Sequence, residues 1–291
     1  MAEYNFLDLL QPAAEYDSAS YVVVPVPFDG TSTWIKGADR GPDAIINASS
    51  QLELYDIETG IEAWKRGIHT MDFSPEISSP EECVSLVSEK TARIIQAGKI
   101  PVILGGEHTV AIGSAWAAAD AYSGLTVLQL DAHGDLRQSY QGSRFNHACV
   151  MARIREKTPI IQAGIRSLAP EEVPEIDRNR MFTARDIHYS GETWIGRLLP
   201  LLTEHVYITL DLDVFDPSCV PATGTPEPGG LGWYEVTALL RAVAEHSRIV
   251  GFDIVELCPN GHHASEFLAA KLVYKIITYR EEHTDGKTGT A

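Results

Sequence analysis

The residues best suited to chemistry in this chain are acids and histidines that directly follow short apolar runs. They lie in the segments Gly105-Gly106-Glu107-His108 after PVIL, Asp131-Ala132-His133-Gly134-Asp135 after LTVLQL, Asp211-Leu212-Asp213 after HVYITL, and Val255-Glu256 after IVGFDI. In open α/β sheets ligands bind beyond the carboxyl ends of the strands. We therefore expect these side chains to meet at one rim of a sheet.

The spacing within DAHGD (131–135) and DLD (211–213) favours a metal centre. In DAHGD three potential ligands alternate with small residues, and in DLD positions i and i+2 of a strand project to the same side. The four aspartates of these segments would repel one another in a partly dry pocket without cations. Carboxylate and imidazole ligands with no thiolate suit manganese and also permit zinc, iron or cobalt.

Each segment has a plainer interpretation when taken alone. A lone DxH or DxD is commonly a turn or a solvated loop, and His108 after two glycines could be a core histidine or a helix cap. The coincidence of three such segments at successive strand ends favours the metal centre.

Apolar runs rich in β-branched residues indicate the strands that position these segments. They are Tyr21–Pro25, Pro101–Leu104, Leu125–Leu130, Pro159–Gln162, His205–Leu210 and Ile249–Ile254. Helices are predicted between them, over 42–56, 109–122, 232–246, 264–280 and from the cap Ser79 to about Ala97, where Pro80 and Glu82 complete a helix-start pattern. Because the strands lack polar alternation, both faces must be covered, which predicts a three-layer α/β/α fold with a mainly parallel sheet.

Composition predicts one soluble domain over residues 1–291, with 281–291 as a frayed polar tail. The formal charge of −17 from 40 acidic and 23 basic residues argues against nucleic acid or anionic lipid as partner. It is compatible with a cationic substrate, with bound metals, or with solubility alone.

The same sequence carries no sign of secretion or membrane insertion. Four separated cysteines without CxxC spacing suggest reduced, buried side chains rather than disulfides or a zinc ribbon. The acidic N-terminal segment does not resemble a signal peptide, and no apolar run is long enough to span a membrane. We expect a cytoplasmic protein with no membrane partner.

At these motifs the sequence resembles the ureohydrolase family, which includes arginase and agmatinase. Gly105–His108 resembles the family's GG(D/E)H segment, Asp131–Asp135 its DAHxD segment, Asp211–Pro217 its DxDxxDP segment, and Pro221–Gly230 its PATGTPxxGG loop. The resemblance implies an arginase-like fold and two manganese ions per subunit. The implied ligands are Asp131 and Asp211 bridging both ions, His108 and Asp135 completing one ion, and His133 and Asp213 completing the other.

The resemblance also implies roles for residues around the metals. Glu256, at the family's E-x-x-P position, would bind the guanidinium group, and its alternative is a surface glutamate before a turn. His147 would carry the proton to the leaving amine, and its alternative is a capping or packing histidine, since Ala148 stands where the family more often has glycine. Thr225 would contact the guanidinium. We take His147, Glu256 and Asp135 as catalytic, and Glu256, Thr225 and His147 as substrate-binding.

Substrate choice follows from finer features of the same resemblance. Gly164-Ile165-Arg166-Ser167 resembles the GIRS segment of agmatinase-like members, and the stretch by which arginases recognise an amino acid is not evident in Leu136–Arg144. This favours agmatine. The ending NGHHASE (260–266) resembles a branch with members that cut N1-aminopropylagmatine. Guanidinobutyrate and arginine stay as further alternatives, and family members are commonly trimers or hexamers.

Two other classes remain open at this point. A deacetylase-like enzyme with a related fold would bind one zinc through Asp131, His133 and Asp211, and a non-catalytic relative would bind without turnover. His262 and His263 could suggest a third metal site, although adjacent loop histidines are more commonly exposed to solvent.

Overall fold

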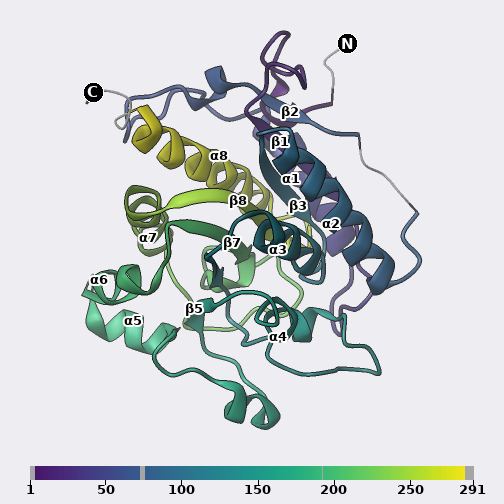
Figure 1. Cartoon of the computed structure of the whole chain (residues 1–291), viewed down its shortest axis with the longest axis vertical. Helices are drawn as coiled ribbons and strands as arrows, with labels where there is room; N and C mark the ends of the chain where they lie inside the picture. Colours follow the sequence, from purple (N-terminus) through teal and green to yellow (C-terminus); the bar gives the residue numbers. More distant parts are fainter. Residues whose placement is uncertain (1–3, 73–75, 192, 286–291) are drawn as a thin grey trace.

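The computed structural model describes residues 4–72, 76–191 and 193–285. A single parallel sheet of eight strands runs through this part of the chain in the order β2-β1-β3-β8-β7-β4-β5-β6 (Figure 1). The strands are β1 (Tyr21–Val26), β2 (Ile68–Thr70), β3 (Ile100–Gly105), β4 (Leu125–Leu130), β5 (Ile160–Ile165), β6 (Met181–Thr183), β7 (His205–Asp211) and β8 (Arg248–Val255).

Burial explains why the six longer strands were visible in the sequence. Every residue of β1, β3 and β4 is buried. These strands therefore consist, apart from Gln129 of β4, of apolar and β-branched residues without polar alternation. All six predicted strands are present: β4 has the predicted bounds, and the ends of the other five differ from the prediction by at most three residues. The prediction missed β2 and β6, which have three residues each and form the two edges of the sheet.

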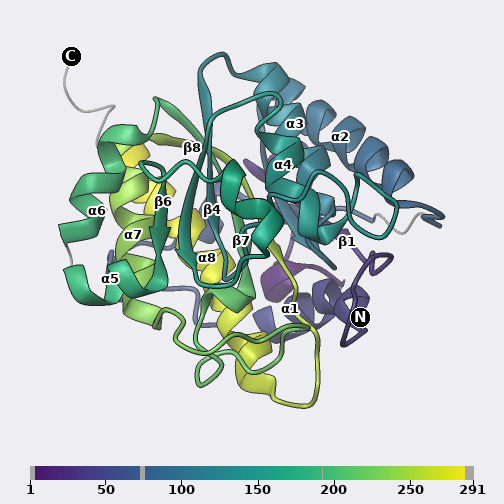
Figure 2. The same ribbon diagram turned by 90° about the horizontal axis from the view of Figure 1, so that it is seen from below.

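Helices cover both faces of the sheet, which is the predicted three-layer arrangement. One layer holds α2 (Pro80–Gln96), α3 (Val110–Ala121) and α4 (Val150–Ile154), and the opposite layer holds α1 (Gly41–Ser49), α5 (Ala184–Ser190), α6 (Thr193–Leu198), α7 (Trp233–His246) and α8 (His263–Asp285) (Figure 2). The predicted start of α2 is confirmed, because the Ser79 side chain accepts a hydrogen bond from the Glu82 backbone N–H at 3.1 Å.

The helix predictions needed three corrections. The short helices α4, α5 and α6 were not predicted. Helix α1 ends at Ser49 rather than at 56. Asp56 lies in the segment that follows the helix, where it forms a buried ion pair with Lys275 (2.9 Å). Helix α8 continues past 280 to Asp285, so residues 281–285 of the predicted tail are helical, and residues 286–291 lie outside the described residues.

The acidic residues in the last turns of α8 have basic partners, which explains why the helix continues past residue 280. Glu281 is buried and pairs with Arg66 (2.8 Å), and Glu282 accepts a hydrogen bond from Arg241 of α7 (3.1 Å). Within the residues that the structure describes, no helix combines the length and the apolar character needed to cross a bilayer.

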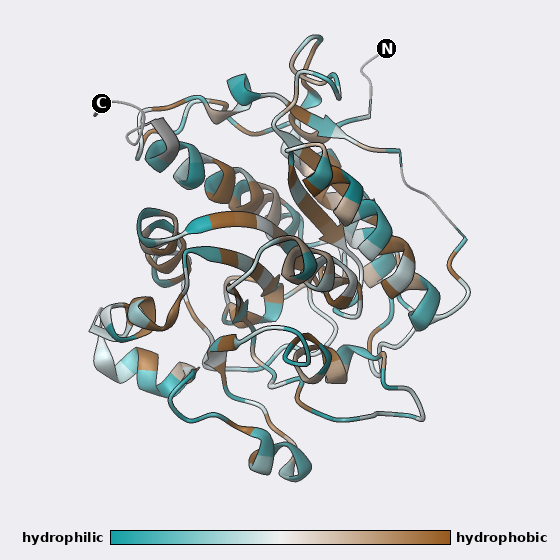
Figure 3. Ribbon diagram, viewed as in Figure 1, coloured by the Kyte–Doolittle hydropathy of each residue, from teal (hydrophilic) through white to brown (hydrophobic). Residues whose placement is uncertain are grey.

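Apolar side chains form the core between sheet and helices. In Figure 3 the ribbons of β1 and β3 carry the hydrophobic colour. The buried polar side chains that matter for function lie at or just below the carboxyl ends of β3, β4, β7 and β8. These four strands occupy the middle of the sheet, in the order β3-β8-β7-β4. After β3, the chain continues with β4 on the other side of β7 and β8, so the direction in which strands are added to the sheet changes here. Open parallel sheets bind ligands at such a switch point.

Gly106 sets how closely β1 and β3 approach beneath this rim. Its backbone N–H donates to the Val26 carbonyl (2.9 Å), and the next N–H, of Glu107, donates to the Phe28 carbonyl (2.8 Å). A Cβ atom at position 106 would lie 2.1 Å from that Phe28 oxygen. Because a backbone atom cannot move aside as a side chain can, only glycine fits here.

We expect Gly106→Ala to lower the free energy of unfolding by about 1–3 kcal/mol, because the added methyl group must push two backbones apart. It should also lower metal content, since His108 follows two residues later. Urea denaturation of the metal-free protein measures the first effect. Gly196→Ala is the matched control, because no heavy atom lies within 4 Å of a Cβ atom there. Equal stability of the two variants would contradict the prediction.

Candidate metal centre

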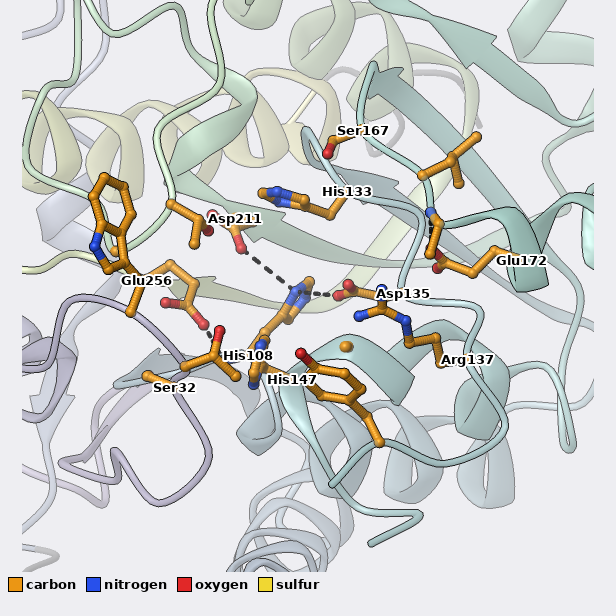
Figure 4. A pocket seen from close by; sticks show the side chains of 18 of the residues that line it. Ser32, His108, His133, Asp135, Arg137, His147, Ser167, Glu172, Asp211 and Glu256 are labelled. Atoms are coloured by element: carbon orange, nitrogen blue, oxygen red, sulfur yellow. Dashed lines mark hydrogen bonds and ion pairs between the residues drawn. The ribbon is translucent and has the colours of Figure 1, made fainter. Parts of the chain in front are cut away.

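The predicted metal ligands converge at the carboxyl ends of β3, β4 and β7. His108 follows β3, the DAHGD segment (131–135) follows β4, and the DLD segment (211–213) spans the end of β7. Figure 4 shows His108 between Asp135 and Asp211, with His133 opposite and Glu256 at the side. The four aspartates are almost fully buried, at 0 to 6% exposure.

Three carboxylates surround one nitrogen of His108. Its Nδ1 atom lies 3.2 Å from Asp131 Oδ2, 3.0 Å from Asp135 Oδ2 and 3.6 Å from Asp211 Oδ2. Ligand atoms of His108, Asp131 and Asp135 all lie within 4.8 Å of one another, which suits a metal ion.

A second group adjoins the first. His133 Nδ1 lies 2.9 Å from Asp213 Oδ2 and 3.7 Å from Asp131 Oδ1. Asp131, His133 and Asp213 again offer atoms within 4.8 Å of one another. Asp131 belongs to both groups. Asp211 is near the first group, through its 3.6 Å distance to His108. The structure therefore brings the six predicted ligands together, but it does not test which ligand binds which ion.

Backbone N–H groups orient three of the aspartates. His133 N donates to Asp131 Oδ1 (2.6 Å), Asp213 N to Asp211 Oδ1 (2.8 Å), and Ala132 N to Asp213 Oδ1 (2.9 Å). The Oδ2 atoms of all three face the histidine rings. The DxH and DxD spacings are therefore tight turns in which the loop's own backbone aims each carboxylate.

The site fits divalent cations by its own chemistry. Among the described residues, His108 Nδ1 is buried and has no aligned hydrogen-bond partner, although three carboxylates surround it. Burial disfavours a charged ring, but attraction to Asp131 and Asp135 outweighs burial and raises the pKa of His108. Burial and the neighbouring acid Asp213 raise the pKa of Asp211. A cation at this point would replace protons as the counter-charge.

Glu256 lies in the same cavity at the end of β8. Its Oε1 atom accepts a hydrogen bond from the His108 backbone N–H (2.8 Å), and its own N–H donates to the Gly106 carbonyl (2.8 Å). Burial and the nearby Glu107 raise its pKa. Its φ is +66°, and Asp135 has φ +53°, so both residues adopt a backbone conformation that costs energy and is common at functional sites.

His147 and Thr225 also line the cavity. His147 Nδ1 lies 3.0 Å from Thr31 Oγ1, and burial together with the charges of His108 and His133 lowers the pKa of His147 to about 4. His147 begins a short 3-10 helix, but Asn146 caps it, with its side chain accepting from Ala148 N (3.0 Å). The alternative role of His147 as the capping residue is therefore wrong.

Several residues that support the site were absent from the sequence-based prediction. His108 Nε2 lies 2.9 Å from Thr209 Oγ1, which donates to Asp253 Oδ1 (2.7 Å). Thr31 Oγ1, which contacts His147 Nδ1, also donates a hydrogen bond to Glu107 Oε1 at 2.9 Å. Asp253 carried a signal in the sequence, because an acid inside the apolar run IVGFDIV (249–255) has no ordinary place in a buried strand.

Three motif residues, Arg166, His262 and His263, lie outside the two metal groups. Arg166 of the GIRS segment donates to the backbone carbonyls of Asp213 (2.6 Å) and Glu227 (2.8 Å), so it braces the ligand loop. His262 and His263 are exposed, and His263 pairs with Glu266 at 2.8 Å. Neither histidine belongs to a group of described residues that could hold a metal.

Comparison with known proteins decides the family. The model of the "Arginase family" matches residues 19–278. The chain belongs to the arginase family. An N(1)-aminopropylagmatine ureohydrolase from Synechocystis sp. is 38% identical to this arginase-family chain over 277 residues, covering 91% of this chain and 90% of that protein. An agmatinase from Pyrococcus horikoshii is 35% identical over 284 residues, covering 94% and 96%.

Solved structures agree with this membership. The agmatine ureohydrolase of Thermoplasma volcanium superposes with a TM-score of 0.88 at 32% identity, covering 98% of this chain and 97% of that one. The resemblance to the agmatinase-like branch of the ureohydrolases is thereby confirmed. Membership of the arginase family identifies the chain as a hydrolase of the kind that acts on guanidino compounds.

Proton release should accompany metal binding. Asp213 and Asp131 raise the pKa of His133 to about 12 against the effect of burial, and the pKa of His108 is raised as well. Both rings are therefore protonated at pH 7.5 in the metal-free protein, whereas a metal ligand must be neutral. Calorimetry with Mn²⁺ in buffers of different ionisation enthalpy should show release of at least about two protons per chain, because burial and Asp213 also raise the pKa of the ligand Asp211.

The sign of this effect fixes the pH dependence of binding. Protons compete with the metal, so the apparent affinity should fall as the pH is lowered. Asp131→Asn, which lacks the carboxylate shared by both groups, should show neither the binding heat nor the proton release. Binding to the unsubstituted chain without net proton release would contradict the prediction.

Proposed function

We propose that the chain is a binuclear manganese amidinohydrolase that converts a guanidino compound into urea and an amine. One observation carries the proposal: the two metal-competent groups share Asp131 and face the cavity that also contains Glu256. When two divalent cations are bound, they supply hydroxide at neutral pH. Net addition of water to the cationic guanidinium then yields neutral urea and a protonated amine.

Glu256 is proposed to bind the guanidinium. One of its oxygens is held by the His108 backbone N–H at 2.8 Å, which leaves the other for the substrate's N–H donors. A charge-assisted contact of this kind orients a planar cation more strongly than a neutral hydrogen bond does. Thr225, exposed in the cavity wall, adds a hydroxyl and a backbone group at the same end.

His147 is proposed to deliver the proton to the leaving amine, with Asp135 as a ligand that takes part in catalysis. The Nδ1 atom of His147 contacts Thr31 at 3.0 Å, which leaves Nε2 for proton exchange in the cavity. Because its pKa lies near 4 in the metal-free protein, the ring is neutral at pH 7 and acts as an acid only after taking up a proton.

We expect the substrate to be a guanidino amine without an α-carboxylate. Sequence features put agmatine first. Relatives named N(1)-aminopropylagmatine ureohydrolase match at 38–39% identity, against 35% for the agmatinase of Pyrococcus horikoshii, which supports the longer polyamine as second candidate. Among the cavity-lining residues, Arg137 is paired with Glu171 at 3.0 Å. Glu256 also lines the cavity and is not among the proposed metal ligands, so its charge favours a cationic substrate.

The proposal extends to the remaining properties of the chain. We infer a single catalytic domain over 1–291, a cytoplasmic location and a homo-oligomer, trimer or hexamer, with no nucleic acid or membrane partner. Sedimentation velocity tests the oligomeric state. The alternative of a single-zinc deacetylase leaves His108, Asp135 and Asp213 without a role, and a content of two metal ions per chain excludes it.

Urea release by Mn²⁺-loaded protein on four substrates tests the function. Agmatine, N1-aminopropylagmatine, arginine and 4-guanidinobutyrate are compared by kcat/KM. We expect a preference for one of the first two. No turnover of any of the four, with full metal occupancy, would sink the proposal and favour a non-catalytic relative.

Glu256→Gln should lower kcat/KM by at least about 100-fold, because a neutral amide cannot pair with the guanidinium. Metal content, measured by plasma emission spectroscopy, should stay unchanged. Glu245→Gln makes the same change at an exposed position of α7 and should leave kcat/KM unaltered. A Glu256→Gln variant with unchanged kcat/KM would remove Glu256 from substrate binding.

A further inference from the structure

Four polar side chains form a row across the middle of the sheet, directly beneath the metal ligands. Gln162 of β5 is in register with Gln129 of β4, Gln129 with Thr209 of β7, and Thr209 with Asp253 of β8. We call these four residues the polar row. They are buried, at 0 to 3% exposure. Asp131 and Asp211 lie two residues after Gln129 and Thr209, hence on the same face and one layer higher.

One half of the polar row contacts a histidine ligand. Thr209 Oγ1 donates its proton to Asp253 Oδ1 at 2.7 Å and lies 2.9 Å from His108 Nε2. A hydroxyl has a single proton, so Thr209 accepts from the His108 Nε2–H. The proton on Nε2 leaves Nδ1 of the neutral ring without one. Nδ1 is the atom that faces Asp131, Asp135 and Asp211.

The other half contacts the carboxylate shared by both metal groups. Gln129 Nε2 donates to Asp131 Oδ2 at 2.7 Å. The Oε1 atom of Gln129 accepts from Gln162 Nε2 at 2.6 Å, and that nitrogen also donates to the Gly134 carbonyl at 2.8 Å. Gln162 thereby fixes which end of the Gln129 amide points at Asp131, as Asp253 fixes the direction of the Thr209 hydroxyl.

Folding alone does not explain this row. The adjoining positions of the same strands carry leucine, isoleucine, phenylalanine and alanine. Polar groups in such a place cost free energy unless they are hydrogen-bonded. Asp253 departs furthest from the rule that buried polar atoms are hydrogen-bonded. It is fully buried and, among the described residues, its Oδ2 atom has no hydrogen-bond partner. Such local violations of the core pattern concentrate where function requires them.

We propose that the polar row is a positioning layer for the metal centre. Thr209 and Asp253 hold His108 in the orientation and tautomer that present Nδ1 to a cation, and Gln162 and Gln129 hold Asp131. The proposal rests on the proposed function only in that divalent cations bind at this centre. The four residues are positioning residues: Thr209 and Gln129 contact ligands, Asp253 and Gln162 hold those two in place, and none of the four lines the cavity.

Thr209→Val tests the proposal in the metal-free protein. Valine keeps the volume and the β-branch but cannot accept the Nε2–H. Calorimetric titration with Mn²⁺ should show about 10–100-fold weaker binding at the site that contains His108. Thr209→Ser retains the hydroxyl and should restore most of the affinity. Asp253→Asn removes the acceptor charge at constant shape and should weaken binding in the same direction.

Thr126→Val is the matched control. Thr126, near the start of β4, is fully buried like Thr209 of β7, and its hydroxyl lies 2.8 Å from that of Thr203. The ligand Asp131 follows the opposite end of β4. Its replacement should lower the thermal midpoint of the metal-free protein without changing Mn²⁺ affinity. A purely structural role for Thr209 would produce the same result as this control.

The outcomes separate this proposal from the proposed function, because the binding assay uses no substrate. Wild-type affinity in folded Thr209→Val would overturn the role of Thr209. Should that variant fail to fold, wild-type affinity in Asp253→Asn would overturn the proposal instead. Weak binding in both, restored by Thr209→Ser, would support the proposal even if none of the four guanidino substrates were hydrolysed.

Discussion

Repulsion among buried carboxylates is the constraint on which the rest of this structure depends. Four aspartates converge within a few ångströms in a site closed to most solvent, and like charges at such a distance cannot all remain ionised without compensation. The surrounding protein supplies backbone N–H donors and two imidazole rings, but these neutralise only part of the charge. The remaining charge makes the site a receptor for small, highly charged cations.

The same constraint explains features around the site that look costly in isolation. The left-handed backbone at Asp135 and Glu256 aims two acids at the cavity, and the surrounding hydrogen bonds hold it there. The bracing of the ligand loop by Arg166 is another example. Within the described part of the chain its guanidinium donates to backbone carbonyls alone, so it supports the loop without placing a competing cation among the aspartates.

Sequence patterns predicted much of this because the decisive information is local. Five of the six ligands lie in DAHGD (131–135) and DLD (211–213), whose turns aim their own side chains, and the strands before them are buried and mostly apolar. The edge strands β2 and β6 were missed because three residues give too short a pattern. The end of α8 was missed because Glu281 and Glu282 read as a polar tail until their partners Arg66 and Arg241 were visible. Thr209 and Gln129 were missed for the same reason, since their register depends on the order of strands in the sheet.

That strand order has a consequence for how the protein is made. β8 is the last strand along the chain, yet it lies between β3 and β7 in the centre of the sheet. A chain emerging from the ribosome exposes His108 and the aspartates after β4 long before β7 and β8 exist to complete the rim. Such long-range pairing is slow and comes late in folding. A nascent chain therefore has no finished site until β8 has emerged, and metal loading has to follow the synthesis of that strand.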